Sequence, residues 1–334
     1  MTGAPTHEPK SARIILNPRA GQAELIAEVR RARALWETRG WQVDWRSTEY
    51  RGHAIELARS AAEAGFDLVV AAGGDGTVNE VVNGIAGTRT ALAVLPVGTG
   101  NVWVRELKLP LRPEAAAAAL LDGATYALDL GQAGDRYFLL MAGVGFDASV
   151  TRQVRPELKR RFGVMAYLLQ ALTIARDVRG TRVQIMLDGR PVKGRVLMVV
   201  IGNSRLYGGF LQITHHASLT DGLLDVAVIK GQDARVAPLH ILSILLRRHN
   251  VTPDLLYHRA REVTISGSTP LDVQVDGDTI GVTPMTFRVV PGALQAWLPP
   301  AAAQELVFAA PQLRFPPVFH RIRRVLINGS NDRP

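Results

Sequence analysis

Cysteine is absent from this chain of 334 residues. The absence excludes disulfide bridges, zinc sites with thiolate ligands and cysteine nucleophiles, and it is compatible with a reducing compartment. The chain also lacks a long hydrophobic run. Its longest, Gly163 to Ala175, is interrupted by Gln170 and is shorter than the roughly 20 residues that a membrane-spanning helix needs. We therefore expect a protein that does not cross a membrane, while contact with a membrane surface stays open.

A leader is not expected at the start of the chain, because the first twelve residues are polar, contain proline and lack an apolar core. Acidic residues are in the minority, with 30 Asp and Glu against 39 Lys and Arg, and the pI is about 10.3. Such an excess attracts phosphates, anionic lipid head groups or nucleic acid, or it serves solubility alone. No nucleic-acid recognition motif is present, so nucleic acid is not an expected partner.

The order of apolar and polar segments predicts two different domains. Short apolar strands at 12–16, 41–47, 66–72 and 90–96 alternate with helical stretches, which is typical of a parallel sheet covered by helices. Beyond about residue 125, short strands are separated by Asp-Gly or Gly-rich turns, which favours an antiparallel sandwich. Helical insertions are predicted at 157–178 and 233–248. We place the domains at 12–128 and 129–305, followed by a basic, proline-containing tail at 306–334.

The stretch AAGGDGTVNE, residues 71–80, joins a buried strand to a helix. The residues after it repeat with the spacing of one helical face: Val78, Val81, Val82 and Ile85. A hairpin turn is therefore disfavoured. Thr77 and Glu80 fit a capping box that begins the helix. A glycine-rich loop at a helix N-terminus binds anions through free backbone N–H groups and the helix dipole.

Spacing excludes the two common nucleotide fingerprints at this loop. No Gly-Lys-Ser/Thr follows, as a P-loop requires, and no glycine completes the dinucleotide pattern. Asp75 inside the loop would repel a phosphate unless Mg²⁺ lies between them. Asp75 is therefore a candidate for organising metal and triphosphate, and the alternative is that it merely caps the helix.

Two further loops are expected at the same edge of the sheet. The stretch LPVGTGN, residues 95–101, follows the next strand, and Asn17 follows the first strand within NPRAG. Because open α/β sheets bind ligands at the carboxyl ends of their strands, the three loops are expected to converge on one crevice.

Six motifs in this order carry a resemblance to a known family: NPRAG, GGDGTVNEVVNG, LPVGTGN, YGGF, ASLTDGLLDV and VDGD. Through them the chain resembles the diacylglycerol kinase catalytic family, which contains bacterial soluble lipid kinases related to sphingosine and ceramide kinases. The resemblance covers about residues 12–300. It implies an N-terminal α/β domain with a parallel sheet, like that of NAD kinases and phosphofructokinases, and a mainly antiparallel β-sandwich C-terminal domain. It also implies ATP in the cleft between them, and ATP- and Mg²⁺-dependent transfer of the γ-phosphoryl group to a hydroxyl of diacylglycerol or a similar lipid.

The resemblance assigns site residues by position. The implied ATP contacts are Asn17, Thr48, Gly73, Gly74, Asp75, Gly76, Thr77, Val78, Asn79, Glu80 and Thr99. A structural Mg²⁺ is implied at a turn, held by the Asp221 carboxylate with the carbonyls of Ser218 and Leu223, which are the hard oxygen ligands that Mg²⁺ prefers. Without the resemblance, Asp221-Gly222 would be interpreted as an ordinary turn.

The implied proton acceptor departs from the family pattern. The family places a glutamate at the third position of Asp-Gly-Glu, and this chain has Asp278 in VDGD. A shorter side chain changes the reach of the base. The alternative is a type I′ hairpin turn with Asp276 and Gly277 at its corners, and both can hold. Two other positions depart from the family pattern. They are Val102-Trp103 after GTGN, and His215 before the turn at 218–223. His215 and His216 are interpreted as a pair of surface or turn histidines rather than as a metal site.

The expected partner is a lipid substrate at a membrane surface. Anionic head groups would meet basic residues beside apolar helices, at 152–161 ahead of 163–175 and again at 245–249. A homodimer is left open. We expect a cytoplasmic location with peripheral contact to the inner face of the membrane. A soluble NAD kinase-like enzyme and a non-catalytic nucleotide or lipid sensor stay open as alternatives, and the sequence does not name the lipid.

Overall fold

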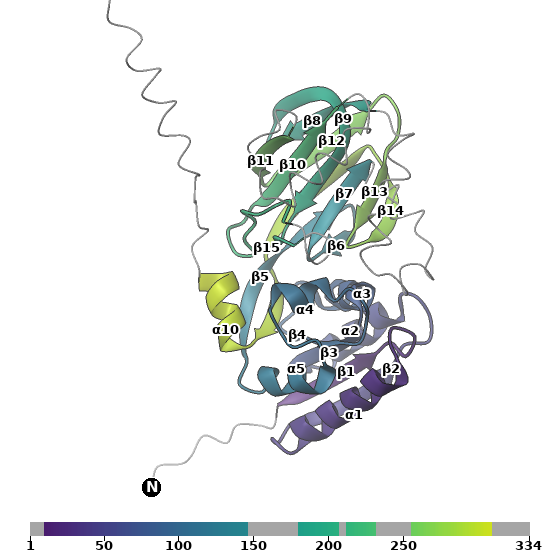
Figure 1. Ribbon diagram of the computed structural model, residues 1–334, viewed down its shortest axis with the longest axis vertical. Coiled ribbons are helices and arrows are strands. Elements are labelled where there is room, and N and C mark those ends of the chain that lie inside the picture. Colours follow the sequence, from purple (N-terminus) through teal and green to yellow (C-terminus); the bar gives the residue numbers. More distant parts are fainter. Residues whose placement is uncertain (1–9, 146–179, 207–211, 232–254, 309–334) are drawn as a thin grey trace, which may run out of the picture.

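The computed structural model describes residues 10–145, 180–206, 212–231 and 255–308. Within these ranges the chain forms a helix-covered part that contains the N-terminal strands and, above it in Figure 1, a part built of strands. The predicted helices at 157–178 and 233–248, the basic residues beside them, the YGGF motif and the proposed tail beyond residue 308 lie outside the described residues. None of the helices in the described ranges is long and apolar enough to cross a membrane.

The helix-covered part alternates strands and helices along the chain. In order it contains β1 (Ser11–Leu16), α1 (Ala23–Glu37), β2 (Gln42–Ser47), α2 (His53–Glu63), β3 (Leu68–Gly73), α3 (Asp75–Ile85), β4 (Ala91–Pro96), α4 (Val102–Glu106) and α5 (Pro113–Leu120). The strands lie in the order β2-β1-β3-β4 and all pairs are parallel. Every residue of β3 and β4 is buried, as expected for strands covered on both faces. The predicted parallel sheet is confirmed.

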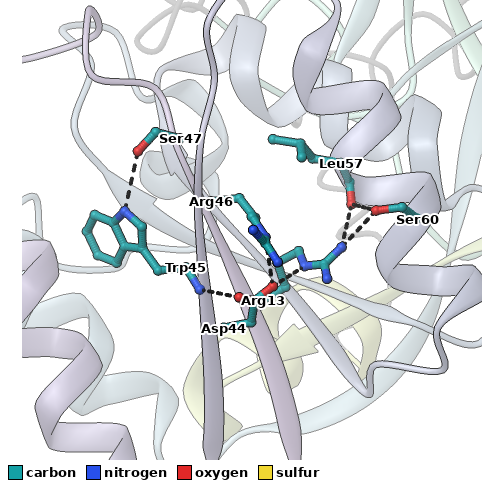
Figure 2. Close-up of polar contacts among 7 residues, drawn as sticks. All are labelled: Arg13, Asp44, Trp45, Arg46, Ser47, Leu57 and Ser60. Carbon is teal, nitrogen blue, oxygen red and sulfur yellow. Dashed lines mark hydrogen bonds and ion pairs between the residues drawn. The ribbon is translucent and has the colours of Figure 1, made fainter.

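Arg13 fastens the outer strand and the second helix to β1. Its Nε donates to Asp44 Oδ2 of β2 at 2.7 Å, and its Nη1 donates to Leu57 O at 3.3 Å and Ser60 Oγ at 2.8 Å on α2 (Figure 2). One half-buried guanidinium therefore bridges β2 and α2. Residues 48–52 connect these two elements, and Arg51 and Gly52 of this loop border the candidate site.

The upper part contains the remaining strands. They are β5 (Ala124–Ala133), β6 (Arg136–Phe138), β7 (Met141–Gly145), β8 (Thr181–Leu187), β9 (Arg190–Gly202), β10 (Leu224–Lys230), β11 (Leu255–Ala260), β12 (Glu262–Gly267), β13 (Asp272–Val275), β14 (Asp278–Val282) and β15 (Met285–Leu298). Their mutual pairings are antiparallel. β11 was not predicted, and β15 unites two predicted strands across a register shift between Val290 and Leu294.

The antiparallel strands fold over one apolar core. β9 forms the corner, because its first half pairs with β8 while its second half pairs with β7 and β10. Both layers contribute to one cluster of buried side chains, including Ile185 of β8, Val226 of β10 and Val273 of β13. The mainly antiparallel sandwich predicted for this region is confirmed.

β15 belongs to both parts of the molecule. Phe287 near its start lies in the core of the upper part, whereas Leu294 lies in the core of the helix-covered part. Its later residues pair antiparallel with β5 and, at Gln295 and Ala296, parallel with β4. β15 thereby extends the sheet beyond β4, and continuous strand pairing joins both parts into one mixed sheet. The addition of β15 as a fifth strand beside the four strands of the parallel sheet was not predicted.

The described chain ends against the helix-covered part. Helix α10 (Pro300–Ala303) continues into one π-helical turn over Gln304–Phe308. Leu306 is buried in the lower core, and Glu305 forms an ion pair with Lys108 at 2.6 Å. The first residues of the proposed tail at 306–334 are thus packed against the protein as far as Phe308, which contacts Tyr126 edge to face.

Candidate active site

The two glycine-rich loops lie against each other at the carboxyl ends of β3 and β4. The amides of Val97 and Gly98 both donate to Gly73 O, at 3.1 and 3.2 Å. A Cβ on Gly98 would lie 2.5 Å from the Cα of Gly74, and a Cβ on Gly73 would lie 2.4 Å from Thr77 Oγ1. Because the chain packs this closely here, these positions have no room for a side chain. The predicted convergence of the loops is confirmed.

Asn17 and Thr48 complete the same edge. The amide of Thr48 donates to Leu16 O at 2.8 Å, and that of Asn17 to Ala72 O at 2.9 Å. The Asn17 side chain donates to Thr77 Oγ1 at 3.2 Å. Thr99 lies exposed in the loop that follows β4. The sheet thus brings the predicted ATP contacts from four loops to one edge.

The predicted capping box is wrong. Helix α3 begins at Asp75 and its N-cap is Gly74, which has no side chain to donate or accept. Thr77 and Glu80 therefore lie inside the helix and are too late in it to cap it. Glu80 instead accepts from the amides of Gly52 at 2.9 Å and Ala54 at 3.2 Å, at the start of α2. Its charge is placed where a helix N-terminus favours a carboxylate.

Asp75 caps a helix, but a neighbouring one. Its Oδ1 accepts from the amide of Val102 at 2.6 Å, the first residue of α4. Because the donor is a backbone N–H, the departure from the family pattern at Val102 does not affect this bond. Asp75 Oδ2 lies beside Gly100, where a Cβ would approach it to 2.7 Å. The carboxylate therefore links the loop after β3 to the loop after β4.

Asp276 accepts hydrogen bonds from four donors at the site, whereas the sequence predicted only its turn. Its two oxygens accept from three successive amides, those of Leu139, Leu140 and Met141, at 2.8, 2.9 and 2.9 Å. They also accept from Asn79 Nδ2 at 2.9 Å. Enclosure away from water raises the pKa of Asp276, against the opposing effect of the four donors. This carboxylate joins α3 to the segment between β6 and β7.

The turn itself is as predicted. Asp276 and Gly277 both have positive φ, at 47° and 89°, and Val275 pairs with Asp278 across them. These are the features of a two-residue type I′ hairpin. Asp-Gly signals this turn in the sequence, but nothing in the sequence signals the four hydrogen bonds of the side chain.

Three side chains dock β6 onto α3. Asn83 Nδ2 donates to Tyr137 O at 3.0 Å while its Oδ1 accepts from the Tyr137 amide at 2.9 Å. Arg136 Nη2 donates to Asn79 Oδ1 at 2.9 Å. Asn83 and Arg136 were not predicted, although Asn83 lies within the GGDGTVNEVVNG stretch. Together with Asp276 they hold the glycine-loop helix against the upper part.

Asp278 opens into a pocket beside this contact. The pocket has a volume of about 330 Å³ and is lined by Arg51, Gly52, Ile55, Glu80, Arg136, Asp278, Thr279 and Ile280. Arg51 Nη2 lies 3.1 Å from Asp278 Oδ1. The structure thus places the predicted proton acceptor in one pocket with Glu80 of the glycine-loop helix, at the junction of the two parts.

The predicted metal turn lies apart from this pocket. Asp221 Oδ1 accepts from the Leu223 amide at 3.1 Å, and its Oδ2 forms an ion pair with Arg259. Asp225 Oδ1 accepts from the Tyr257 hydroxyl at 2.6 Å, and its Oδ2 lies 3.6 Å from Arg259 Nε. Burial raises the pKa of Asp221, and it raises the pKa of Asp225 to about 6.

Carboxylates gather around this turn. Asp129 also reaches the turn, because its Oδ2 accepts from the Gly222 amide at 2.7 Å. Asp225 Oδ2 is buried and lacks a hydrogen bond among the described residues. Asp221 and Asp225 thus share one guanidinium, and Asp129 lies beside the same turn. No group of three or more His, Asp or Glu side chains in the described ranges is arranged to hold a metal. A Mg²⁺ at this turn would therefore need backbone carbonyls beside Asp221, and it would compete with Arg259 for that carboxylate.

Comparison with known proteins follows this division of the chain. Residues 11–133 match the model of the diacylglycerol kinase catalytic domain. Residues 141–298 match that of the YegS C-terminal NAD kinase beta sandwich-like domain. A diacylglycerol kinase catalytic domain followed by this sandwich places the protein in the class of lipid kinases.

The relatives agree in length as well as in sequence. The chain is 32% identical over 302 residues to a diacylglycerol kinase of Bacillus subtilis, covering 89% of this chain and 99% of the relative. It is 37% identical over 283 residues to a probable lipid kinase YegS-like of Pseudomonas putida, covering 84% and 93%. A crystal structure of a diacylglycerol kinase from Bacillus anthracis superposes with a TM-score of 0.73 at 26% identity, covering 88% and 98%. The chain belongs to the diacylglycerol kinase family.

Proposed function

We propose that this lipid kinase transfers the γ-phosphoryl group of ATP, with Mg²⁺, to a hydroxyl of diacylglycerol or a similar lipid presented at a membrane surface. The observation that supports the proposal most is the contact between Asn79 and Asp276. It fixes the helix of the glycine-rich loop to the turn that carries Asp278. The phosphate-binding loop and the candidate base are therefore held on one frame.

The nucleotide is proposed to bind at the edge formed by Asn17, Thr48, the loop from Gly73 to Glu80, and Thr99. Backbone amides at the start of α3 would face its phosphates. Bound Mg²⁺ would neutralise charge on the phosphate oxygens, and Asp75 is proposed to orient it. The Asp75 carboxylate accepts a hydrogen bond from the Val102 amide at 2.6 Å, which holds it between the two glycine-rich loops.

Asp278 is proposed to accept the proton of the lipid hydroxyl. The hydroxyl oxygen forms the new bond to the γ-phosphorus, the bond to the β-phosphate oxygen breaks, and ADP leaves. The proton passes to an Asp278 oxygen. The pocket beside Asp278 offers room for an acceptor hydroxyl next to that carboxylate. A general base contributes roughly 10²- to 10⁴-fold, so Asp278→Asn is expected to lower kcat within that range.

A transfer assay tests this proposal. Purified protein is incubated with labelled ATP, Mg²⁺ and a panel of lipids in mixed micelles, and NAD is included as a soluble acceptor. The expected result is label in diacylglycerol or a related lipid, strongly reduced in Asp278→Asn. Label in NAD would instead favour the NAD kinase-like alternative. Tight ATP binding without transfer to any acceptor would favour a non-catalytic sensor.

The structural Mg²⁺ is a separate part of the proposal. The Asp221 carboxylate and the carbonyls of Ser218 and Leu223 are proposed to hold it at the turn before β10. Charge supports this assignment, because Asp221 and Asp225 share the Arg259 guanidinium and Asp129 accepts from the Gly222 amide of the same turn. Asp129 would transmit its effect to the frame of the protein, since Asp129 also accepts from the Gly292 amide of β15 at 2.9 Å.

A further inference from the structure

The pocket beside Asp278 contains two arginines that the transfer step described above does not use. Arg51 comes from the loop before α2 and Arg136 from β6, so two distant segments bring guanidinium groups to one cavity. The carboxylates facing them are those of Asp278 and Glu80. Glu80 is engaged, because both of its oxygens accept backbone amides at the start of α2. The pocket thus has more cationic donors than its own carboxylates need.

Arg51 is paired with the candidate base in a contact that has little structural value. Its Nη2 lies 3.1 Å from Asp278 Oδ1, while the Arg51 side chain is 76% exposed and that of Asp278 is 30% exposed. Exposed ion pairs contribute little to stability. The pair engages Oδ1 of the proposed base, beside the position where the lipid hydroxyl would bind. A phosphate bound there would compete with Asp278 for the Arg51 guanidinium.

Arg136 is held in the wall of the pocket. Its Nη2 is anchored by Asn79 of the glycine-loop helix. Its Nε is buried and has no hydrogen-bond partner among the described residues. A guanidinium has five N–H donors and no acceptor, so this group keeps unused capacity for an anion. The anchor fixes Arg136 relative to the proposed phosphate loop.

The transfer step generates the anion that would use these donors. The oxygen that attacks phosphorus beside Asp278 becomes the ester oxygen of a phosphate, so the transferred group arrives next to two carboxylates. Phosphate beside Asp278 and Glu80 is repelled unless cations separate them. Arginine binds phosphate through two parallel N–H bonds. Arg51 is exposed and paired with the base, and it is therefore placed to supply them.

We propose that Arg51, supported by Arg136, binds the phosphomonoester of the lipid phosphate product, and that Arg51 exchanges its contact with Asp278 for this phosphate. The inference rests on the proposed function for the identity of the lipid, but the phosphate site is defined by the pocket itself. Arg51 is accordingly a binding residue for the transferred group. Without that phosphate, Arg51 contacts the proposed base.

Binding measured without turnover separates this inference from the kinase activity. Short-chain phosphatidic acid and inorganic phosphate are titrated into the full-length protein by calorimetry, without ATP. Arg51→Gln is expected to bind phosphatidic acid at least about tenfold more weakly than wild type, because it loses charge-assisted hydrogen bonds. Arg51→Lys keeps the positive charge but not the paired N–H donors of the guanidinium, so its affinity for phosphatidic acid is expected to lie between those of wild type and Arg51→Gln. Asp278→Asn is expected to bind more tightly than wild type, since Arg51 is released.

Matched controls exclude a general charge or folding effect. Arg33→Gln removes a surface arginine that pairs with Glu37 at 2.9 Å on α1, and it should leave phosphatidic acid affinity unchanged. ATP affinity and the unfolding temperature of Arg51→Gln should stay at wild-type values. Equal weakening of ATP and phosphatidic acid would overturn the assignment, because Arg51 would then act on the nucleotide side or on the loop.

The two phosphate sources give distinct outcomes. If only the affinity for phosphatidic acid depends on Arg51, the site is assigned to a lipid phosphate. If the affinity for inorganic phosphate depends on Arg51 as well, the site is assigned to phosphomonoesters in general. An affinity independent of Arg51 with both probes overturns the proposal. If wild type binds phosphatidic acid through Arg51 but phosphorylates no lipid in the transfer assay, the proposed function fails while this site stands.

Discussion

Asn79 and Asp276 are 197 positions apart in the chain and are joined by a 2.9 Å hydrogen bond from Nδ2 to Oδ2. One residue belongs to the glycine-loop helix and the other to the hairpin turn that carries Asp278. Asp276 simultaneously accepts hydrogen bonds from three successive amides, which run from the end of β6 into the first residue of β7. The Asp276 carboxylate, which does not itself line the pocket, therefore links the proposed phosphate loop to the hairpin of the proposed base.

Asp276→Asn is expected to destabilise the protein and to lower its activity. An asparagine would direct its NH₂ group toward the hydrogen-bond donors, which leaves at least one backbone amide without an acceptor. The loss of a hydrogen bond to a charged group costs about 2 kcal/mol. Denaturant unfolding measures the stability. Asp278→Asn is the control, because its side chain is partly exposed and its ion pair with Arg51 lies at the surface. Equal stability of the two variants would contradict the bridging role.

Asp75→Asn and Asp75→Ala should separate capping from metal handling. Asparagine keeps an acceptor for the Val102 amide, so its stability should stay near wild type, whereas alanine loses the cap at a cost of about 1 kcal/mol. Both should lose transfer activity by at least about 100-fold if the charge orients Mg²⁺. Stability and turnover are measured on the same preparations. Retained turnover in Asp75→Asn would show that Asp75 is a cap alone.

Removal of divalent cations should destabilise the wild-type protein. Mg²⁺ that binds only the folded state adds about 2.7 kcal/mol at a hundredfold excess over its Kd. The unfolding temperature is compared in Mg²⁺ and in EDTA, without nucleotide, for wild type and Asp221→Ala. The Mg²⁺-dependent increase should vanish in the variant. An unchanged increase would place the stabilising ion elsewhere.

Glu106 should make stability fall as pH rises. Burial raises its pKa, against the opposing effects of Arg205 and the Leu206 amide. A carboxyl group whose pKa is higher in the folded state takes up a proton on folding when the pH lies between its unfolded and folded pKa values. The free energy of unfolding therefore declines as the pH rises from the unfolded pKa of about 4.3 to the folded pKa. Glu106→Gln carries no such charge, so its stability relative to wild type should increase with pH. Chemical denaturation across a range of about pH 4 to 8 tests this, and a constant difference would contradict it.

Much of the fold could be predicted because its signals are local. The continuous apolar segments predicted β3 and β4 as buried parallel strands, and the spacing of Val78, Val81, Val82 and Ile85 predicted the buried face of α3. Asp-Gly predicted the type I′ turn at 276–277. Each of these features depends on side-chain periodicity or on backbone conformation within a few residues.

The features that were missed depend on tertiary contacts. Thr77 and Glu80 have the spacing of a capping box, but Gly74 already begins the helix and their side chains bond other elements. Asp276 looks like a turn residue, and its four donors come from segments far away in the chain. Arg51 and Arg136 have no local pattern, because only folding brings them to Asp278. The individual ATP-binding, catalytic and metal-binding residues were predicted from the family resemblance, and their roles stay predictions.

The double membership of β15 constrains how the chain is made. The helix-covered part is synthesised first, yet its β4 edge is paired by Gln295 and Ala296, close to the end of the described chain. Until those residues leave the ribosome, a fully buried strand has one unpaired edge, which is a template for wrong pairing. Contacts of such large sequence separation also form slowly. The nascent first half therefore carries this exposed edge until Gln295 and Ala296 have been synthesised.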